Sequence, residues 1–434
     1  MLRTAAAVEG AGSGRICRSR TGIRRGDTSS RYRPSATHDF IRINASSGWT
    51  GKSGCRRRGC SPASHRLHYG WSGKGLFVSD VGDGMSKLRV GVIGAGGIAA
   101  KLHLPEMQTV TDAEVVVLAG RKPSRLETLC KKFDVPESTH DYEDVARRED
   151  LDAVIVALPH PLHVEYGLQA LAAGKHVLMQ KPLSTSLDEA DQFVEAVEAG
   201  DRTVLALPFV SRPHVLEARE QVRNGALGTI SSAHARFSHG GPEVYYATIQ
   251  AILEEEPEQE LWFFDASQAD VGALFDMGVY AIAHLVAILG EVRTVTCRLT
   301  TRAKPTQLED TAALILEFSS GVIGTAETGW CDGARTYEFS IHGTDGKVTN
   351  PSLTDRLVLS RPTASDDEDA GLNEQELDLS NWPNVNAHQC WVQCIQQGTQ
   401  PEICDARYAR HVTEIMLRGL ASAREGRTLD VRPM

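Results

Sequence analysis

One side chain in this sequence, Lys181, suits the transfer of a proton beside a reacting alcohol. Lys181 stands directly before Pro182 and after the apolar run 176–179. Because open α/β sheets bind ligands at the carboxyl ends of their parallel strands, a lysine there can give a proton to a bound hydroxyl group or accept one. Asp276 and Tyr280 lie four residues apart, so on a helix their side chains point to one face.

A glycine cluster lies between an apolar run and a helical pattern near the start of the globular region. Residues 94–99 fit the pattern G-x-G-x-x-A, which typically approaches the pyrophosphate of a dinucleotide. Gly94 permits the tight turn, Gly96 admits the phosphates, and Ala99 allows close packing of helix and strand. The alternative is a purely structural glycine turn. The expected phosphate contacts are Gly94, Gly96, Gly97 and Ile98, at the positive end of the helix.

The end of the second expected strand bears on the choice of cofactor. It reads Ala119, Gly120, Arg121, Lys122, without the carboxylate that typically binds the ribose 2′-hydroxyl of NAD. Arg121 can pair with a 2′-phosphate or stack on adenine. We therefore expect NADP, with NAD as the alternative. A solvated loop cation fits Lys122 better than Arg121.

Two further segments identify a family. Residues 152–159 follow the pattern D-x-V-x-I-x-x-P, His163 follows four positions later, and residues 173–182 read A-G-K-H-V-L-M-Q-K-P. Together they resemble the Gfo/Idh/MocA oxidoreductases, and the resemblance covers roughly residues 86–434. It implies further cofactor contacts at Leu158, Pro159, His163, Gln180 and Lys181.

The resemblance also implies roles for the proton-transfer candidates. The family places a D-x-G-x-H segment in its second domain, and here Asp276 and Tyr280 occupy its ends. The resemblance implies that Lys181, Asp276 and Tyr280 converge on the substrate as catalytic residues. Tyrosine at position 280 is similar to the branch containing glucose–fructose oxidoreductase and dihydrodiol dehydrogenase. The alternative is that Asp276 caps a helix and Tyr280 packs in the core.

The sequence departs from the family pattern at three places. Gln180 replaces a glutamate beside the lysine, residues 269–272 replace most of a Gly-rich run, and Tyr280 replaces a histidine. These departures change the charge beside Lys181, the edge of the substrate pocket and any imidazole-based proton relay. They leave the Lys181 and Asp276 pair in place.

The resemblance implies an NAD(P)-dependent oxidoreductase. A hydride would move between the nicotinamide and a carbinol or carbonyl carbon of a sugar, polyol or cyclic diol, with Lys181 as general acid and base. One alternative is a dinucleotide-binding sensor or regulator without catalysis. Another is a reductase of a planar imine or tetrapyrrole, whose aromatic pocket would include Trp262, Phe263 and Phe264.

The pattern of elements predicts two domains after a basic extension. Strands expected at 88–93, 114–119, 153–158, 176–179 and 203–207 alternate with helices, which indicates a doubly wound parallel Rossmann sheet over 85–206. Over 207–434 the expected strands follow one another after a first helix, which favours an α+β domain with a large, mostly antiparallel open sheet built as a meander. We expect that sheet to join subunits as a homodimer or homotetramer.

Composition limits the other classes of protein. Residues 1–84 carry 15 Lys and Arg against 5 Asp and Glu and show no amphipathic period, so we expect a disordered extension, with Met85 as the natural start. The remainder is acidic, which disfavours nucleic acid as a partner. Nine cysteines without regular spacing favour a reducing, cytoplasmic setting.

Two further segments point away from a membrane span and a metal site. Residues 271–290 are apolar enough to suggest a membrane span, but Asp276 and His284 favour a buried soluble segment. His234, His239 and Glu243 have metal-ligand chemistry, yet a strand and its loop often carry such residues. We predict a small-molecule substrate, no membrane and no metal.

Overall fold

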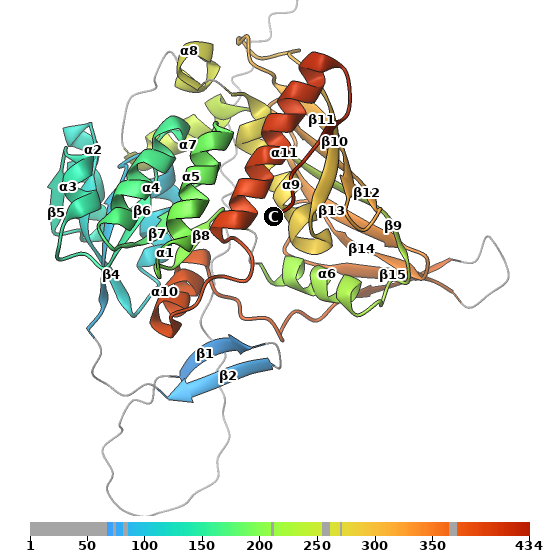
Figure 1. Cartoon of the computed structure of the whole chain (residues 1–434), viewed down its shortest axis with the longest axis horizontal. Helices are drawn as coiled ribbons and strands as arrows, with labels where there is room; N and C mark the ends of the chain where they lie inside the picture. Colours follow the sequence, from blue (N-terminus) through green and yellow to red (C-terminus); the bar gives the residue numbers. More distant parts are fainter. Residues whose placement is uncertain are drawn as a thin grey trace, which may run out of the picture. The chain divides into compact units, whose positions relative to one another are not determined.

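The computed structural model describes the backbone of residues 67–72 and 75–80, and residues 86–209, 212–253, 261–269, 271–363 and 371–434 (Figure 1). Within the basic extension, β1 (Leu67–Ser72) and β2 (Gly75–Asp80) pair as an antiparallel hairpin that the sequence pattern did not predict. The rest of the extension, residues 254–260 and Asp270 lie outside the described residues.

The first sheet contains six parallel strands in the order β5-β4-β3-β6-β7-β8. Its central strands are apolar throughout and buried on both faces, as a covered parallel sheet requires. The order reverses between β3 and β6, which is where doubly wound sheets bind ligands. The strands are β3 (Leu88–Ile93), β4 (Ala113–Ala119), β5 (Glu137–Thr139), β6 (Ala153–Val156), β7 (His176–Met179) and β8 (Val204–Ala206).

Helical segments connect these strands. Local sequence sets several ends: α2 begins with Pro123 at its first helical position, and α5 begins after Ser186, whose hydroxyl accepts from the Glu189 amide at 3.4 Å. The segments are η1 (Ala99–His103), α1 (Leu104–Met107), α2 (Pro123–Phe133), α3 (Tyr142–Arg147), η2 (His160–Leu162), α4 (His163–Ala172) and α5 (Leu187–Glu198).

The second sheet contains nine strands in the order β16-β15-β14-β13-β9-β12-β11-β10-β17. It is mixed but mostly antiparallel, which confirms the predicted fold class. The strands are β9 (Ile230–Ser238), β10 (Val292–Thr300), β11 (Thr311–Phe318), β12 (Ile323–Gly329), β13 (Thr336–Gly343), β14 (Gly346–Asn350), β15 (Val358–Pro362), β16 (Leu372–Glu376) and β17 (Leu429–Asp430).

The prediction of a simple meander was wrong for β9. This strand lies between β12 and β13 and runs parallel to β12. A long helical stretch separates β9 from β10, so the chain can return to the far side of β12 before it forms the meander β10-β11-β12. Pairing between strands that are distant in the chain leaves no local signal in the sequence.

The helices of the second part lie mainly along one face of this sheet, where α9 and α11 cover β9 to β12 (Figure 1). Residues 271–290 form η4 and α9 and are almost entirely buried. None of the described helices has both the length and the apolar character that a membrane span requires. The helical segments are α6 (Pro213–Arg223), α7 (Pro242–Leu253), η3 (Trp262–Phe264), α8 (Ala266–Ala269), η4 (Leu274–Gly278), α9 (Val279–Leu289), α10 (Ala387–Gln397) and α11 (Ala406–Glu425).

A network of charges around the buried Glu414 and Arg410 connects the two parts. Asp191 on α5 accepts hydrogen bonds from Arg410 Nε on α11 at 2.7 Å and from Arg432 Nη2 at 2.9 Å. Glu414, whose side chain is fully buried, pairs with the same two arginines. Such a network fixes orientation because removing one member leaves an uncompensated buried charge. It holds α5 of the first sheet against the helix that covers the second.

Candidate active site

The glycine turn after β3 has the geometry that a dinucleotide needs. Gly94 adopts a φ of 116°, and a Cβ built on it would lie 2.2 Å from the carbonyl oxygen of Ala157. A Cβ built on Gly96, in contrast, would meet nothing within 4 Å. The backbone at Gly96 is therefore open to a phosphate, while the first N–H groups of the following helix lack intrahelical partners. These residues fit a bound dinucleotide.

Helix α7 covers one side of this turn. A Cβ built on Gly97 would come within 2.7 Å of the Ile249 side chain. The Lys101 ammonium lies 4.5 Å from the centre of the Tyr245 ring, on the same helix. Helix α7 was not predicted, and it brings side chains from the second part of the chain directly onto the glycine turn.

The end of β4 places the two expected cofactor cations at the surface. Arg121 and Lys122 are both exposed, and Arg121 hydrogen-bonds the Tyr142 hydroxyl. Gly120 is required for packing, since a Cβ there would lie 2.5 Å from the Ala95 Cβ. The guanidinium at this strand end is thus open to solvent.

Lys181 and Asp276 meet, although they lie 95 residues apart in the chain. Lys181 follows β7 and is joined to Pro182 by a cis peptide bond, and its Nζ donates to Asp276 Oδ1 at 2.8 Å and to the Asp276 carbonyl oxygen at 2.6 Å. Their side chains are 11% and 13% exposed. The pair is thus a nearly buried ion pair that still reaches solvent.

Two more residues complete the surroundings of Asp276. Trp330, after β12, donates from Nε1 to Asp276 Oδ2 at 2.9 Å, and His239, after β9, lies with Nε2 3.6 Å from the same oxygen. Burial by itself would raise the pKa of Asp276, but the Lys181 charge and the adjacent His239 ring more than offset it and lower that pKa. Asp276 is therefore ionised at neutral pH.

A half-buried glutamate positions the segment that carries Asp276. Glu309 Oε1 accepts from the backbone amides of Gly272 and Leu274, at 3.1 and 3.2 Å. It acts as a cap for η4, whose free N–H groups would otherwise be unsatisfied. Burial raises the pKa of Glu309, while those two amides lower it.

Tyr280 lies beside the lysine on the first turn of α9. Lys181 Nζ is 5.3 Å from the centre of its ring, and the ring packs 4.2 Å from Phe209 and 6.0 Å from Phe237, centre to centre. Burial raises the pKa of the Tyr280 hydroxyl, which keeps it protonated at neutral pH. The structure therefore brings together all three residues to which the sequence assigns catalysis.

His163 sits behind the site and is fully buried. Its Nε2 contacts the carbonyl oxygen of Leu158 at 2.8 Å, and its Nδ1 contacts that of Pro182 at 2.7 Å. The imidazole therefore links the end of β6, where Leu158 and Pro159 lie, to the turn that carries Lys181. With both nitrogens facing backbone oxygens, it is placed to hold these two segments.

Gln180 is part of a buried chain of hydrogen bonds. Its Oε1 accepts from the Lys181 amide at 2.6 Å, and its Nε2 contacts His103 Nε2 at 3.1 Å. His103 Nδ1 contacts His388 Nε2 at 2.8 Å, and His388 Nδ1 contacts Glu106 Oε2 at 2.8 Å. The chain extends from Glu106 on α1, through His388 on α10, to the lysine turn.

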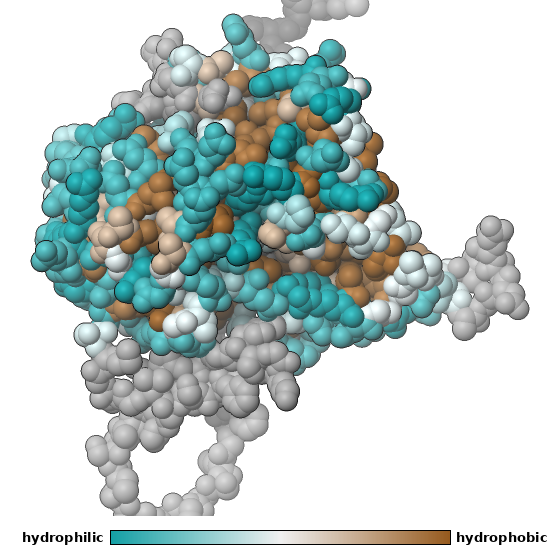
Figure 2. Space-filling model, in the orientation of Figure 1, coloured by the Kyte–Doolittle hydropathy of each residue, from teal (hydrophilic) through white to brown (hydrophobic). Residues whose placement is uncertain are grey.

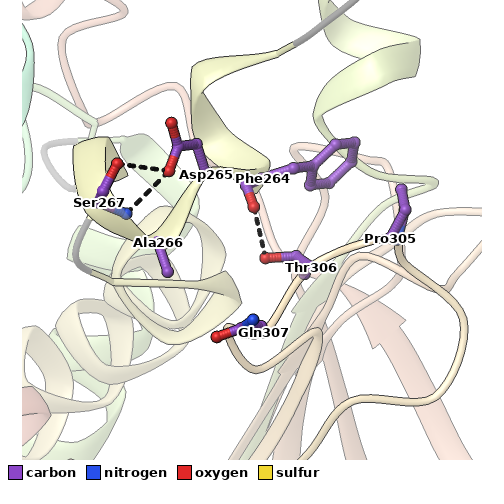
Figure 3. Close-up of a pocket in the computed structure, with 7 residues that line it drawn as sticks. All are labelled: Phe264, Asp265, Ala266, Ser267, Pro305, Thr306 and Gln307. Carbon is purple, nitrogen blue, oxygen red and sulfur yellow. Dashed lines mark hydrogen bonds between the residues drawn. The ribbon is translucent and has the colours of Figure 1, made fainter.

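A shallow pocket of about 590 Å³ lies away from this pair, between α8 and the loop after β10 (Figure 3). Thr306 donates to the carbonyl oxygen of Phe264 there, and Ser267 donates to Asp265. Neither Lys181 nor Asp276 lines it. The lining residues are Phe264, Asp265, Ala266, Ser267, Pro305, Thr306 and Gln307.

The aromatic segment considered for a planar substrate is divided between two places. Phe264 faces this pocket and also packs 5.9 Å from the Trp330 ring, whereas Phe263 contacts His160 and Trp330 at 6.0 and 6.3 Å, centre to centre. The Trp262 side chain lies outside the described residues. Phe263 and Phe264 thus both pack against the ring of Trp330.

A parallel sheet with an open glycine turn, followed by a mixed sheet that delivers a carboxylate to its lysine, defines a two-domain protein built on a dinucleotide-binding fold. Residues 88–206 match the family model described as "Oxidoreductase family, NAD-binding Rossmann fold", and residues 215–349 match the GFO/IDH/MocA C-terminal domain. Together these matches cover more than half of the chain. The chain belongs to the GFO/IDH/MocA family of oxidoreductases, as the sequence motifs predicted.

Characterised relatives are similar over parts of their length. A dTDP-3,4-didehydro-2,6-dideoxy-alpha-D-glucose 3-reductase of Actinomadura kijaniata is 34% identical over 206 residues, which cover 47% of this chain and 56% of that protein. The chain thus spans little more than half of this relative. A levoglucosan dehydrogenase of Pseudarthrobacter phenanthrenivorans is 27% identical over 323 residues, 66% of this chain and 78% of that protein.

Solved structures share the fold. The complex of a levoglucosan dehydrogenase with NADH has a TM-score of 0.68 at 22% identity, covering 80% of this chain and 100% of that chain. An aldose-aldose oxidoreductase from Caulobacter crescentus has a TM-score of 0.66 at 20% identity, with 80% and 100% coverage. At such identities the likeness supports the architecture.

Proposed function

We propose that this protein is a nicotinamide-dependent oxidoreductase that interconverts a secondary alcohol and a carbonyl group. Its substrate is a sugar, polyol or cyclic diol, and Lys181 is the general acid and base. One observation supports this most strongly: the Lys181 ammonium lies 2.8 Å from the Asp276 carboxylate at the end of a parallel strand. Ligands of open α/β sheets bind at that edge.

The side chains divide the work of the reaction. A dinucleotide held at the glycine turn of residues 94–97 would supply the hydride chemistry. In reduction, the Lys181 ammonium donates a proton to the carbonyl oxygen as that oxygen gains charge; in oxidation, the neutral amine accepts the hydroxyl proton. Asp276 pairs with the ammonium and fixes its direction. The Tyr280 hydroxyl can donate a second hydrogen bond to the same oxygen.

NADP is the proposed cofactor in preference to NAD. Residues 119–122 offer an exposed guanidinium and an exposed ammonium, and no carboxylate that would repel a 2′-phosphate. Titration of the purified protein with NADPH and NADH, followed by fluorescence of the reduced nicotinamide, compares the two directly. Tighter binding of NADH would contradict the role assigned to Arg121.

Assembly through the second sheet is part of the same proposal. Ile315 on β11 and Ile323 on β12 are 52% and 44% exposed on the face opposite the helices. Figure 2 shows hydrophobic residues on the side of this sheet, while the outer helices α2 and α3 are mostly hydrophilic. An apolar sheet face in water favours pairing with a second copy. A monomer in light scattering would contradict this.

The decisive experiment replaces the lysine. Lys181→Ala is expected to bind NADPH normally and to lose at least about 100-fold in kcat, the lower end for a positioned acid or base. Lys131→Ala, an exposed lysine on α2, is the matched control and should keep full activity. A screen of sugars, inositols and diols at the nicotinamide absorbance band supplies the substrate. Unchanged turnover in Lys181→Ala would remove this lysine from the mechanism, and binding without turnover of any alcohol would favour the sensor.

A further inference from the structure

The tautomer of His239 follows from its surroundings. Its Nδ1 accepts a hydrogen bond from the Gly241 amide at 2.8 Å. A nitrogen that accepts from a backbone N–H carries no proton, so in the neutral ring the proton lies on Nε2. The backbone of His239 is also fixed, because its amide donates to the Gly329 carbonyl and its carbonyl accepts from the Asp332 amide, both at 3.1 Å.

The Nε2–H of His239 faces Asp276 without forming a full hydrogen bond. The distance to Asp276 Oδ2 is 3.6 Å, beyond the usual range for such a bond. Trp330 already donates to that oxygen at 2.9 Å. His239 keeps 13% of its side-chain surface exposed. The donor is therefore held next to the carboxylate and remains accessible.

Asp276 has acceptor capacity beyond its protein partners. An ionised carboxylate offers about four lone-pair sites. Lys181 occupies one on Oδ1 and Trp330 one on Oδ2. A donor on His239 and an acceptor on Asp276, side by side, match a hydroxyl group, which accepts one hydrogen bond and donates another.

We propose that His239 Nε2–H and Asp276 Oδ2 together bind the hydroxyl group adjacent to the one that reacts, which makes His239 a specificity-determining residue of the site. This inference rests on the proposed function, which puts the reacting hydroxyl on Lys181. Lys181 lies on Oδ1 of the carboxylate and His239 on Oδ2. A vicinal diol can therefore place one hydroxyl group at Lys181 and the neighbouring hydroxyl group at Oδ2 of the carboxylate, in the way that two parallel donors bind one carboxylate.

The position of His239, directly after β9, explains how it reaches the site. Position 280, where the family pattern has a histidine, is a tyrosine in this chain. His239 follows β9, the strand that lies between β12 and β13, and so reaches the same carboxylate from another direction. The site therefore contains an imidazole that comes from the sheet, at His239, in place of one on α9 at position 280.

The role of His239 is tested by comparing two substrates in the wild type and in a His239 variant. The probes are trans-1,2-cyclohexanediol and cyclohexanol, which differ only in the second hydroxyl group. The protein is loaded with NADP⁺, and kcat/KM and the dissociation constant from calorimetry are measured for each probe. Wild type should favour the diol about 10-fold or more, and His239→Leu should lower the diol value about 10-fold while changing the cyclohexanol value less than about twofold.

Two variants separate recognition from structural support. His239→Gln keeps a side-chain N–H donor and should recover part of the preference for the diol. His234→Leu, on the same strand but 3.8 Å from Glu327 instead of Asp276, is the control and should leave the preference unchanged. Equal losses for both probes in His239→Leu, or no preference in wild type, would overturn the inference.

Failure of the proposed function gives a different result. Turnover of neither probe, together with binding of the diol that depends on His239, would refute the oxidoreductase and keep the diol site. Turnover of both probes at rates that His239→Leu leaves in the same ratio would keep the oxidoreductase and refute the diol site.

Discussion

The ion pair between Lys181 and Asp276 predicts a large energetic coupling that can be measured without knowing the substrate. The perturbation is a double-mutant cycle with Lys181→Met and Asp276→Asn. Removing one partner of a buried pair costs about 3–5 kcal/mol, because the other charge stays buried without compensation. Since the side chains keep 11% and 13% exposure, we expect each single variant to lose about 3 kcal/mol of unfolding free energy.

The double variant should lose far less than the sum of the two singles. With both charges gone, neither is left uncompensated, and the side-chain amide introduced by Asp276→Asn retains a carbonyl oxygen that can accept from Trp330 Nε1. The expected coupling is about 2 kcal/mol. Urea unfolding followed by far-ultraviolet circular dichroism gives the four free energies.

The same cycle has a defined dependence on pH. The pKa of Asp276 is lowered in the folded state, so the pair contributes its full stability above the unfolded-state pKa of about 3.9 and loses it as the pH falls. The cost of Asp276→Asn should therefore be constant from about pH 6 to 8 and shrink below about pH 4.

An exposed pair in the second sheet supplies the control cycle. Arg356 Nε donates to Glu376 Oε2 at 2.8 Å, but the side chains are 56% and 52% exposed. Exposed pairs contribute about 0.2–1 kcal/mol. A coupling at Lys181 and Asp276 as small as that of Arg356 and Glu376 would refute the reasoning from burial.

Two further predictions concern the cofactor turn and the glutamine beside the lysine. Gly96→Ala should fold normally, since its Cβ meets nothing, yet bind the dinucleotide at least about 10-fold more weakly. Gly94→Ala should lower the melting temperature, because its Cβ would clash with the Ala157 carbonyl oxygen. Equal effects of the two variants on the melting temperature would contradict this. Gln180→Glu should destabilise the protein by about 1–3 kcal/mol near pH 8 and by less near pH 5.5. The reason is that a buried carboxyl group facing the His103 nitrogen has a raised pKa. A difference in urea midpoint between variant and wild type that stays constant with pH would contradict this.

Local sequence was sufficient where an element has its own start, period and end. The sequence predicted β3 and β7 with the bounds that the structure shows. It missed β16, whose five residues are polar or exposed and show no alternation between a buried and an exposed face. The order of the second sheet could not be predicted because the pairing of β9 depends on contacts between distant strands.

The candidate site was predictable to the same extent. Motifs identified Lys181 and Asp276, and the structure places them in contact. Trp330 and Glu309 had no motif of their own. Trp330 lies 54 residues from Asp276 in the chain, and Glu309 lies 37 and 35 residues from Gly272 and Leu274, whose amides it accepts from. His239 was noticed only as a weak metal ligand. Its neighbour in space is Asp276, which no local pattern around residue 239 indicates.

The glutamine at position 180 illustrates how one departure from a family pattern follows from its neighbours. Read from the Glu106 carboxylate, His388 Nδ1–H donates to it, His103 Nδ1–H donates to His388, and the Gln180 amide donates to His103. Each step uses one proton, and burial lowers the pKa of His103, which keeps one of its nitrogens free to accept. A carboxylate at 180 would oppose an acceptor to an acceptor. The amide satisfies the chain and leaves Lys181 paired to Asp276 without a competing charge from its own neighbour.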